Sequence, residues 1–551
     1  MTSPWRRRLP WLVLLLVCLV LFGSTVHNEL GDIGGDSATY VLLAKSLATG
    51  QGYRDLADPA QRPHVKYPPL FPLMLAPLVS AFGPLTFWPM HALVAAFAVI
   101  AILLTVVLVH ALDDRMGGWL AGWATAAHPW VLASLLCLWT EFPYLALSLL
   151  ALFALHRYRT TITMPNRWLW IAAAATAAAA LTRVVGWMVV LAGVCSLWPA
   201  RPWRAPRAWL PLACWLAVTL LPLGAWAARN AAIHDPAGAA YGYWREWQLA
   251  DPLHPEQGAV DGAGLMRRVC AQTALYTLMI GHALSIGIWP LAGQLLLVAW
   301  VLLGWAVAWR RARGVVEWYV AWYLLMLVLH PWNEGGRLLL PILPLLWHYL
   351  WVGGGWCVGR VRRPPWSSVV RVGAVAGVAL TLAGQAIAAA QVVRFQHTDF
   401  RLPPPEVLAR EPQRRSMQWS RMNVGIPRQQ AALFVAMTDT FELMDWMRRH
   451  LTERTVILSR KPSITTLLSG HPSILFPFTM DTAAWRSAMA GGMPVALLAD
   501  RFGAYSWQYA WPFVEAHADL FEPMHTIGTA TLFHVAIERW PASTRSSEQR
   551  R

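Results

Sequence analysis

Residues 88–112 read WPMHALVAAFAVIAILLTVVLVHAL, an apolar run without a Lys, Arg, Asp or Glu. A transmembrane helix needs about 20 mostly apolar residues, and a helix satisfies its own backbone groups in lipid. Comparable runs recur over the first 390 residues of the 551-residue chain, which is 56% hydrophobic. Only 13% of its residues are charged, against about 25% in soluble proteins. The sequence therefore predicts an all-α polytopic membrane bundle.

The apolar runs predict about 11 transmembrane helices. The first, Trp11–Phe22, follows Arg6–Arg8 and resembles the charged and apolar regions of a signal peptide. No clean small-residue cleavage site follows it, so we expect an uncleaved helix with a cytoplasmic N-terminus. We keep open a re-entrant piece at 276–288. The other predicted spans are 88–112, 119–139, 142–156, 168–182, 184–198, 208–227, 289–309, 317–330, 338–352 and 369–392.

The net charge of +16 lies largely in short breaks between apolar runs. In a soluble protein such a charge would suggest nucleic-acid binding, but here the arginine clusters fall at alternate breaks, which is the positive-inside pattern. We therefore exclude nucleic acid as a partner and expect a multi-pass protein of the bacterial inner membrane. An odd number of spans places the C-terminal region on the extracytoplasmic face. The clusters are Arg6–Arg8, Arg157 with Arg159 and Arg167, Arg201 with Arg204 and Arg207, Arg310 with Arg311 and Arg313, and Arg360 with Arg362 and Arg363.

The character of the chain changes near residue 394. Residues 401–405, Arg-Leu-Pro-Pro-Pro, indicate a stiff linker. Beyond it, residues 441–451 have a helical period, whereas 455–458 and 495–499 read as short apolar strands. The predicted parts are a transmembrane domain over 1–393, a small extracytoplasmic α/β domain over 394–540 and a disordered polar tail over 541–551.

The first large extracytoplasmic loop, about 26–87, is long, polar and not of low complexity, and loops of that kind are usually functional. Asp36 begins a predicted amphipathic helix with Tyr40, Leu43 and Leu47 on one face. Asp is also a favoured helix N-cap, so Asp36 has a purely structural interpretation as well. Farther on, Pro68-Pro69 fixes an extended approach to a short apolar helix, either as part of a site or as a topological turn.

The loop pattern Tyr40-x-x-x-Ala-x-x-Leu-x-x-Gly-x-Gly-Tyr53 follows a Gly-Asp pair and precedes Tyr67-Pro-Pro-Leu70. In this form the loop resembles that of the GT-C fold glycosyltransferases, in particular the aminoarabinose transferase and protein O-mannosyltransferase group. The resemblance covers residues 10 to 350 well and the rest loosely. Weaker matches follow in order: Thr140-Glu141, Leu181-Thr182-Arg183, Arg229-Asn230, Arg337 leading into Leu338–Pro344, and Trp446–Leu451 with Val456–Pro462.

The resemblance implies transfer of a sugar from a polyprenyl-phosphate carrier to a lipid, glycan or protein acceptor at the extracytoplasmic face. It makes Asp36 the catalytic residue, and a carboxylate can deprotonate an acceptor hydroxyl as that oxygen attacks the anomeric carbon. One base suffices for a one-step inverting transfer, because the leaving group is a phosphate. Glu141 stands where relatives have a second acidic residue, which could orient the acceptor, position a cation or coordinate a metal.

Arginines suit the donor phosphate because they form bidentate hydrogen bonds. Arg183 and Arg337 are the leading candidates, although each could instead reach toward the membrane surface with its charged end. Second-line candidates for donor binding are Lys66, Arg229 and Tyr40.

The sequence departs from the aminoarabinose transferases at one position, because their acidic residue ahead of the double Pro is replaced here by Lys66 and Tyr67. A divalent metal site is therefore in doubt, although His64 could substitute beside Asp36 and Glu141. The six cysteines are scattered, without metal-ligand spacing or a disulfide framework.

Two other classes of protein stay open. One is a transporter or flippase, which predicts charges or broken helices near the midplane of the membrane. The other is a catalytically silent scaffold that binds a partner through residues 394–540.

Overall fold

We analysed a computed structural model of the chain. The residues that it describes are 4–28, 30, 32, 34–112, 115–161, 165–199, 206–233, 243–252, 257–332, 334–360, 366–397, 431–451, 454–489, 495–501 and 503–540. The predicted linker at 401–405 and the predicted tail at 541–551 lie outside these residues.

The chain forms two compact units, and neither is continuous in sequence. The helical unit contains most of the predicted membrane bundle, and the mixed unit combines parts of the first loop with the C-terminal sheet. The helical unit is made of 1–27, 64–73 and 89–395. The mixed unit is made of 28–63, 74–88 and 396–551.

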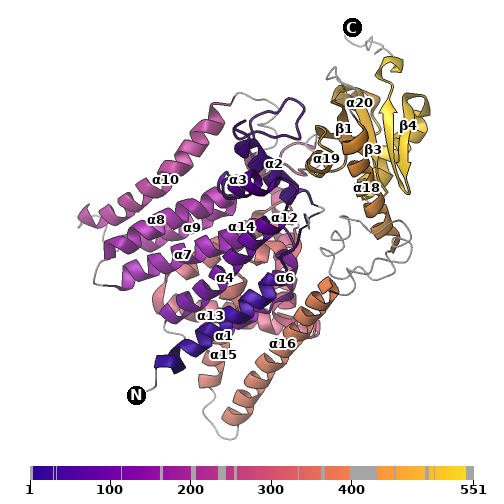
Figure 1. Cartoon of the computed structure of the whole chain (residues 1–551). Coiled ribbons are helices and arrows are strands. Elements are labelled where there is room, and N and C mark those ends of the chain that lie inside the picture. The colour runs from indigo at the N-terminus through magenta and orange to yellow at the C-terminus, as the bar shows by residue number, and fades with distance from the viewer. Residues whose placement is uncertain are drawn as a thin grey trace. The chain divides into compact units, whose positions relative to one another are not determined.

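The helical unit consists of long helices joined by short turns. Helix α7 packs against α8, α8 against α10, and α13 against α15 (Figure 1). Short 3-10 turns η1 (Val184–Gly186), η2 (Pro206–Trp209) and η5 (Gly335–Leu339) lie between helices. The helices are α1 (Pro4–Gly23), α4 (Trp88–Ala111), α5 (Arg115–Ala126), α6 (Pro129–Ser134), α7 (Glu141–Thr160), α8 (Pro165–Thr182), α9 (Trp187–Leu197), α10 (Leu210–Ala231), α11 (Tyr243–Gln248), α12 (Gly262–Ser285), α13 (Leu291–Ala312), α14 (Val315–Leu329), α15 (Leu343–Arg360) and α16 (Trp366–His397).

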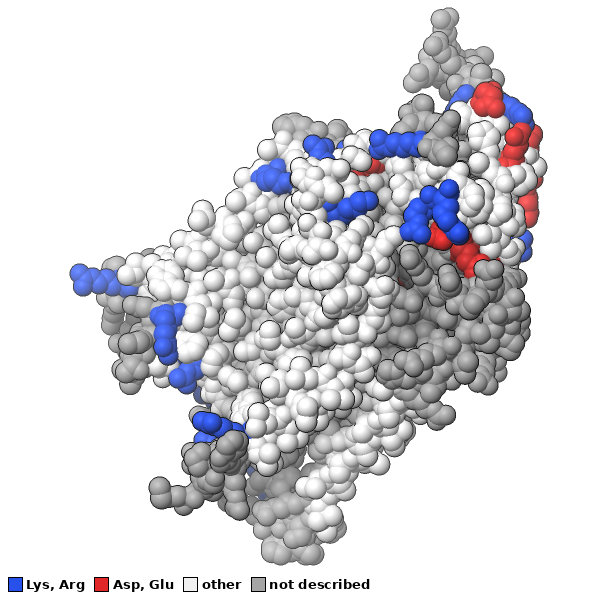
Figure 2. Space-filling model, viewed as in Figure 1, with Lys and Arg blue, Asp and Glu red and all other residues white. Residues whose placement is uncertain are grey.

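Several helices have the length and composition of membrane spans. Among the described residues, four are long and apolar enough, and they include Trp88–Ala111 and Leu291–Ala312. On the face seen in Figure 2, Lys and Arg lie at the margins of the helical unit and uncharged residues cover most of it. Large apolar side chains such as Leu221 on α10, 76% exposed, point outward. The protein is a helical membrane protein, and the count of about 11 spans stays a prediction.

Two helix assignments differ from the sequence-based ones. The predicted span 119–139 is broken between α5 and α6, because Pro129 has no backbone N–H to continue the first helix. The His128 ring caps α6 by accepting from the Trp130 N–H at 3.1 Å. The stretch 276–288, considered above for a re-entrant piece, contains the second half of a longer helix, α12. Helix α12 runs without a break from Gly262 to Ser285, and the preceding Asp261 caps it by accepting from the Gly264 N–H at 2.7 Å.

Glycines allow α13 and α15 to cross at close range. A Cβ added to Gly304 would lie 1.8 Å from the carbonyl oxygen of Tyr349, and one added to Gly353 would lie 2.2 Å from that of Trp300. Backbones in membrane bundles approach this closely only where small residues face each other. The two glycines therefore fix this contact.

The mixed unit contains a five-stranded sheet of order β2-β1-β3-β5-β4. Strands β2, β1 and β3 are parallel, with Ile457 opposite Ser473 and Val456 opposite Val495. Strands β5 and β4 complete the sheet antiparallel, as Figure 1 shows. The strands are β1 (Val456–Ser459), β2 (Ser473–Leu475), β3 (Val495–Ala499), β4 (Phe521–Ile527) and β5 (Ala530–Val535). The helices are α2 (Asp36–Ala48), α18 (Ala431–His450), α19 (Pro462–Ser469), α20 (Thr482–Met489) and α21 (Trp511–Ala516), and α3 (Leu70–Phe82) begins in the helical unit and ends here.

The predicted α/β character of the C-terminal region is confirmed. The two predicted strands correspond to β1 and β3, and the predicted helix at 441–451 is part of α18. Strands β2, β4 and β5 were not predicted. The core beneath the sheet is aromatic: the rings of Trp485 and Phe513 are fully buried and stack with centroids 4.1 Å apart.

Candidate active site

The turn before Asp36 is held by a different aspartate. Gly35 adopts φ +102°, a conformation that favours glycine, and α2 starts at the next residue, Asp36. The Asp32 carboxylate is buried and accepts from the Gly34 N–H at 2.6 Å and from the Ser37 N–H at 2.8 Å. It also accepts from the Ser37 hydroxyl at 3.0 Å. Asp32 therefore provides the capping that the structural interpretation had assigned to Asp36.

Helix α2 is buried on most of its surface. Residues Ser37 to Ala44, Tyr40 included, are all buried. The predicted amphipathic character is wrong, because Ser37 and Thr39 satisfy their hydroxyls inside the protein and leave no polar face exposed.

Lys461 lies over the same turn and was not found from the sequence. It follows β1 and donates from Nζ to the Gly34 carbonyl at 2.9 Å. A second bond joins the hydroxyls of Thr39 and Ser463 at 2.8 Å. Burial lowers the pKa of Lys461, as does the neighbouring Arg460, whereas the carboxylates of Asp32 and Asp36 act in the opposite direction. The C-terminal region thus holds a cationic side chain beside the backbone that leads into Asp36.

The position of Lys461 in the sheet is characteristic of ligand-binding segments. It lies at the carboxyl end of β1, and the neighbours β2 and β3 are both parallel to β1 on either side. Open α/β sheets bind ligands at such switch points. On the next parallel strand, Asp500 follows β3 and pairs with Arg460 at 3.7 Å. The segment at the carboxyl ends of these parallel strands is in contact with the first loop, because Lys461 binds the Gly34 carbonyl.

In the helical unit, Glu141 joins two predicted site arginines. Its carboxylate is 1% exposed, and its Oε1 accepts from both Arg183 and Arg337. Arg183 also donates to the Thr140 hydroxyl at 3.2 Å. The side chains of the two arginines are 14% and 15% exposed. Both arginines are therefore bound to a buried carboxylate. Their charged ends do not extend toward the membrane surface.

Three helix ends bring this cluster together. Glu141 is the first residue of α7, where a negative charge is favoured by the helix dipole. Arg183 separates α8 from η1, and Arg337 lies in η5. The first residue of η5, Gly335, adopts φ +62°, and a Cβ on Gly336 would clash with the Trp130 ring at 2.5 Å.

The arrangement leaves one acceptor and a positive charge in a buried place. Within the described residues, Glu141 Oε2 is buried and has no hydrogen-bond partner. Arg337 also pairs with Glu334 at 3.3 Å, but Glu334 is 37% exposed, so solvent screens that contact. Two guanidinium groups thus face one buried carboxylate, an arrangement suited to binding a further anion such as a phosphate.

The second-line candidates have protein partners of their own. Lys66 pairs with Glu246 at 2.6 Å. Arg229 donates to the carbonyl oxygen of His64 at 2.6 Å and so holds that segment of backbone. Their roles at a phosphate stay predictions.

Two of the residues considered for a metal, His64 and Glu141, have protein partners in the helical unit. The described residues contain no group of three or more His, Cys, Asp or Glu side chains placed to hold an ion. His64 Nε2 accepts from the Tyr67 N–H at 3.0 Å, and Glu141 Oε1 is held by two cations.

Comparison with known proteins identifies the fold. No protein-family model matches the chain, and no curated protein matches its sequence. Solved structures do match over nearly the whole chain. ArnT from Cupriavidus metallidurans, bound to undecaprenyl phosphate, is similar with a TM-score of 0.56 and 14% identity over 95% of this chain and 97% of that one.

Two further structures have the same architecture. The archaeal oligosaccharyltransferase AglB from Archaeoglobus fulgidus, in complex with an inhibitory peptide and a dolichol-phosphate, gives a TM-score of 0.54 with 11% identity over 98% of this chain and 76% of that one. The arabinofuranosyltransferase AftD from Mycobacteria gives 0.50 with 14% identity over 96% and 41%. The chain has the GT-C glycosyltransferase fold, as its sequence resemblance implied.

Proposed function

We propose that the protein is a glycosyltransferase that moves a sugar from a polyprenyl-phosphate carrier to a lipid, glycan or protein acceptor. The observation that carries the proposal is the buried Glu141 carboxylate with Arg183 and Arg337 bound to one of its oxygens. The fold supports it, because the similar structures of ArnT and AglB hold undecaprenyl phosphate and dolichol-phosphate. We assign the protein to the bacterial inner membrane, with transfer at the extracytoplasmic face.

In the proposed reaction Asp36 is the general base. It removes the proton of the acceptor hydroxyl while that oxygen forms a bond to the anomeric carbon. The bond from that carbon to the carrier phosphate breaks, the configuration inverts and the polyprenyl phosphate leaves. Lys461 positions Asp36, since it binds the carbonyl oxygen of Gly34 two residues earlier.

The donor phosphate is assigned to Arg183 and Arg337. Their guanidinium groups each carry five N–H donors in a planar fork that matches the oxygens of a phosphate. Preorganised donors stabilise the charge that develops on a leaving phosphate without reorganising during the reaction. Glu141 acts in this proposal by orienting the two arginines, and its second oxygen remains available as an acceptor for a substrate hydroxyl.

The test uses the full chain in proteoliposomes with undecaprenyl-phosphate-linked sugars. We expect wild-type protein to release undecaprenyl phosphate in the presence of an acceptor fraction, and Asp36→Asn to abolish release while still binding undecaprenyl phosphate. The matched control is Asp58→Asn, in the same loop, where Asp58 forms an i,i+4 ion pair with Arg62. Full activity of Asp36→Asn would remove the assignment of the base, and movement of carrier without turnover would favour a flippase instead.

A further inference from the structure

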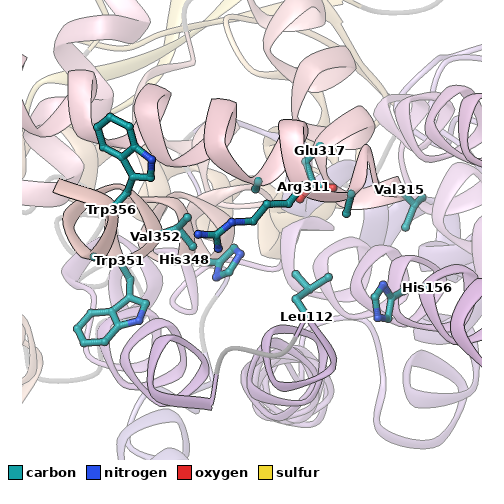
Figure 3. Close-up of a pocket in the computed structure, with 13 residues that line it drawn as sticks. Leu112, His156, Arg311, Val315, Glu317, His348, Trp351, Val352 and Trp356 are labelled. Atoms are coloured by element: carbon teal, nitrogen blue, oxygen red, sulfur yellow. The ribbon is translucent and has the colours of Figure 1, made fainter. Parts of the chain in front are cut away.

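A cavity of about 570 Å³ lies in the helical unit at the turn between α13 and α14. Small-molecule sites typically have about 300–1,000 Å³, so its size suits a ligand. The cavity is closed on another side by α15, and α4 and α7 reach it near their C-terminal ends. The chemistry-bearing side chains around it are His156, Arg311, Glu317, His348, Trp351 and Trp356 (Figure 3).

The cavity is separate from the candidate active site. Both Glu141 and His156 belong to α7, the first at its start and the second near its end. At 1.5 Å per residue they are about 22 Å apart along the helix. The turn at the cavity carries Arg310, Arg311 and Arg313, one of the clusters that the positive-inside pattern assigns to the cytoplasm. The cavity therefore belongs to the predicted cytoplasmic end of the bundle.

Glu317 is the residue that points to a ligand. Its side chain lines the cavity although only 3% of the residue is exposed. Oε1 accepts from the Tyr349 hydroxyl at 3.4 Å. Oε2 has no hydrogen-bond partner in the described part of the chain. It lies against Gly314, where a Cβ would be 2.6 Å away. A buried carboxylate oxygen without a donor is costly, so this position favours a ligand that brings a positively charged N–H group.

Arg311 supplies the opposite charge. It lines the same cavity and is exposed, and Figure 3 shows it among the lining side chains. A guanidinium pairs well with a phosphate. Trp351, 37% exposed, also lines the opening, and Trp is enriched at the level of lipid headgroups. The site thus offers an acceptor for an ammonium inside and a donor for a phosphate at the rim.

The histidines do not turn this site into a metal centre. His156 Nε2 bonds to the carbonyl oxygen of Ala111 at 2.8 Å. No metal-binding group of three or more His, Cys, Asp or Glu occurs in the part of the chain that the structure describes. An ammonium is therefore the better match for Glu317 than a divalent cation.

We propose that this cavity binds the headgroup of a phosphatidylethanolamine lipid from the cytoplasmic leaflet. Glu317 accepts N–H bonds from the ammonium, and Arg311 binds the phosphate. Phosphatidylcholine has the same charges, but its quaternary nitrogen has no N–H to donate to Glu317 Oε2. The site therefore distinguishes the two lipids by a hydrogen bond rather than by charge. This inference is independent of sugar transfer.

The experiment measures lipid binding to the delipidated full chain in detergent by native mass spectrometry. A charge-assisted hydrogen bond predicts that phosphatidylethanolamine binds about tenfold more tightly than phosphatidylcholine. Glu317→Gln keeps a carbonyl oxygen for Tyr349 and is expected to bring the ratio close to one. Arg311→Gln weakens both lipids alike, because both carry the phosphate. The control is Arg310→Gln, a neighbouring exposed arginine that does not line the cavity.

Equal binding of the two lipids by wild-type protein would overturn the proposal. This comparison needs no variant, so the proposal can be refuted even if Glu317→Gln fails to fold. Retention of the preference in folded Glu317→Gln would also overturn it. Soluble glycerophosphoethanolamine is the third arm. If it displaces the lipid at equal concentration, the site takes a free headgroup and the assignment to a membrane lipid fails.

Discussion

Replacing Glu141 by Gln should destabilise the helical unit and leave its fold intact. The amide has nearly the same shape, but it removes the one buried negative charge that Arg183 and Arg337 share. Removing one partner of a buried pair typically costs about 3–5 kcal/mol. The amide oxygen still accepts a hydrogen bond and the arginines are 14% and 15% exposed, so we expect the lower part of that range, about 3 kcal/mol.

The assay is unfolding of the purified chain by titration with sodium dodecyl sulfate in mixed micelles, followed by circular dichroism. The matched control is Glu334→Gln, which removes the 37% exposed partner of Arg337 and should cost less than about 1 kcal/mol. In a double-mutant cycle, Glu141→Gln and Arg183→Met should be coupled by about 1–3 kcal/mol. A Glu141→Gln protein no less stable than Glu334→Gln, or a coupling near zero, would refute the reasoning.

Three further results are expected. Lys461→Met removes the bond to the Gly34 carbonyl and should speed amide exchange around Asp36 about fivefold; unchanged exchange would contradict the positioning role. Burial lowers the pKa of His471, so the unfolded state binds the proton first and the sheet should lose stability as pH falls below about 6.5. His471→Gln should flatten that slope in hydrogen exchange, and an identical slope would argue against it. Gly353→Ala places a Cβ 2.2 Å from a carbonyl oxygen and should lower the free energy of unfolding by about 1–3 kcal/mol. The control Gly355→Ala places its Cβ in open space and should leave the stability unchanged in the same melt. Equal effects of the two variants would contradict the close crossing of α13 and α15.

The sequence alone predicts the helical membrane character and the α/β nature of the C-terminal region, because both depend on local hydrophobic patterns. It fails where a nearby proline or a distant partner decides the outcome. Pro129 breaks a run that contains no Lys, Arg, Asp or Glu. Helix α12 was missed because Arg267 and Arg268 interrupt the apolar pattern of its first half. Strand β4 was missed because it alternates little and is mostly exposed.

In the candidate site, too, local patterns predict some features and distant contacts decide the others. Glu141, Arg183 and Arg337 could be selected as charged residues at helix ends, but their shared contact joins positions up to 196 residues apart. No local pattern predicts that contact. Lys461 could have been suspected from its place after an apolar strand and before Pro462, a typical strand-to-helix turn. The hydrogen bond from Lys461 to Gly34 could not be predicted from the sequence, because 427 residues separate the two.

That separation has a consequence for the time course of biosynthesis. The bond between Thr39 and Ser463 spans 424 residues, and at about 5–20 residues per second the ribosome needs roughly 20–85 s to make them. During that interval the segment before Asp36 exists without the strand-to-helix turn that holds it. The loop is consequently completed last, after the membrane helices have been synthesised. A nascent chain released before residue 456 would contain all the residues of the helical unit. It would lack Lys461 and Ser463, which bind the backbone and side chain on either side of Asp36.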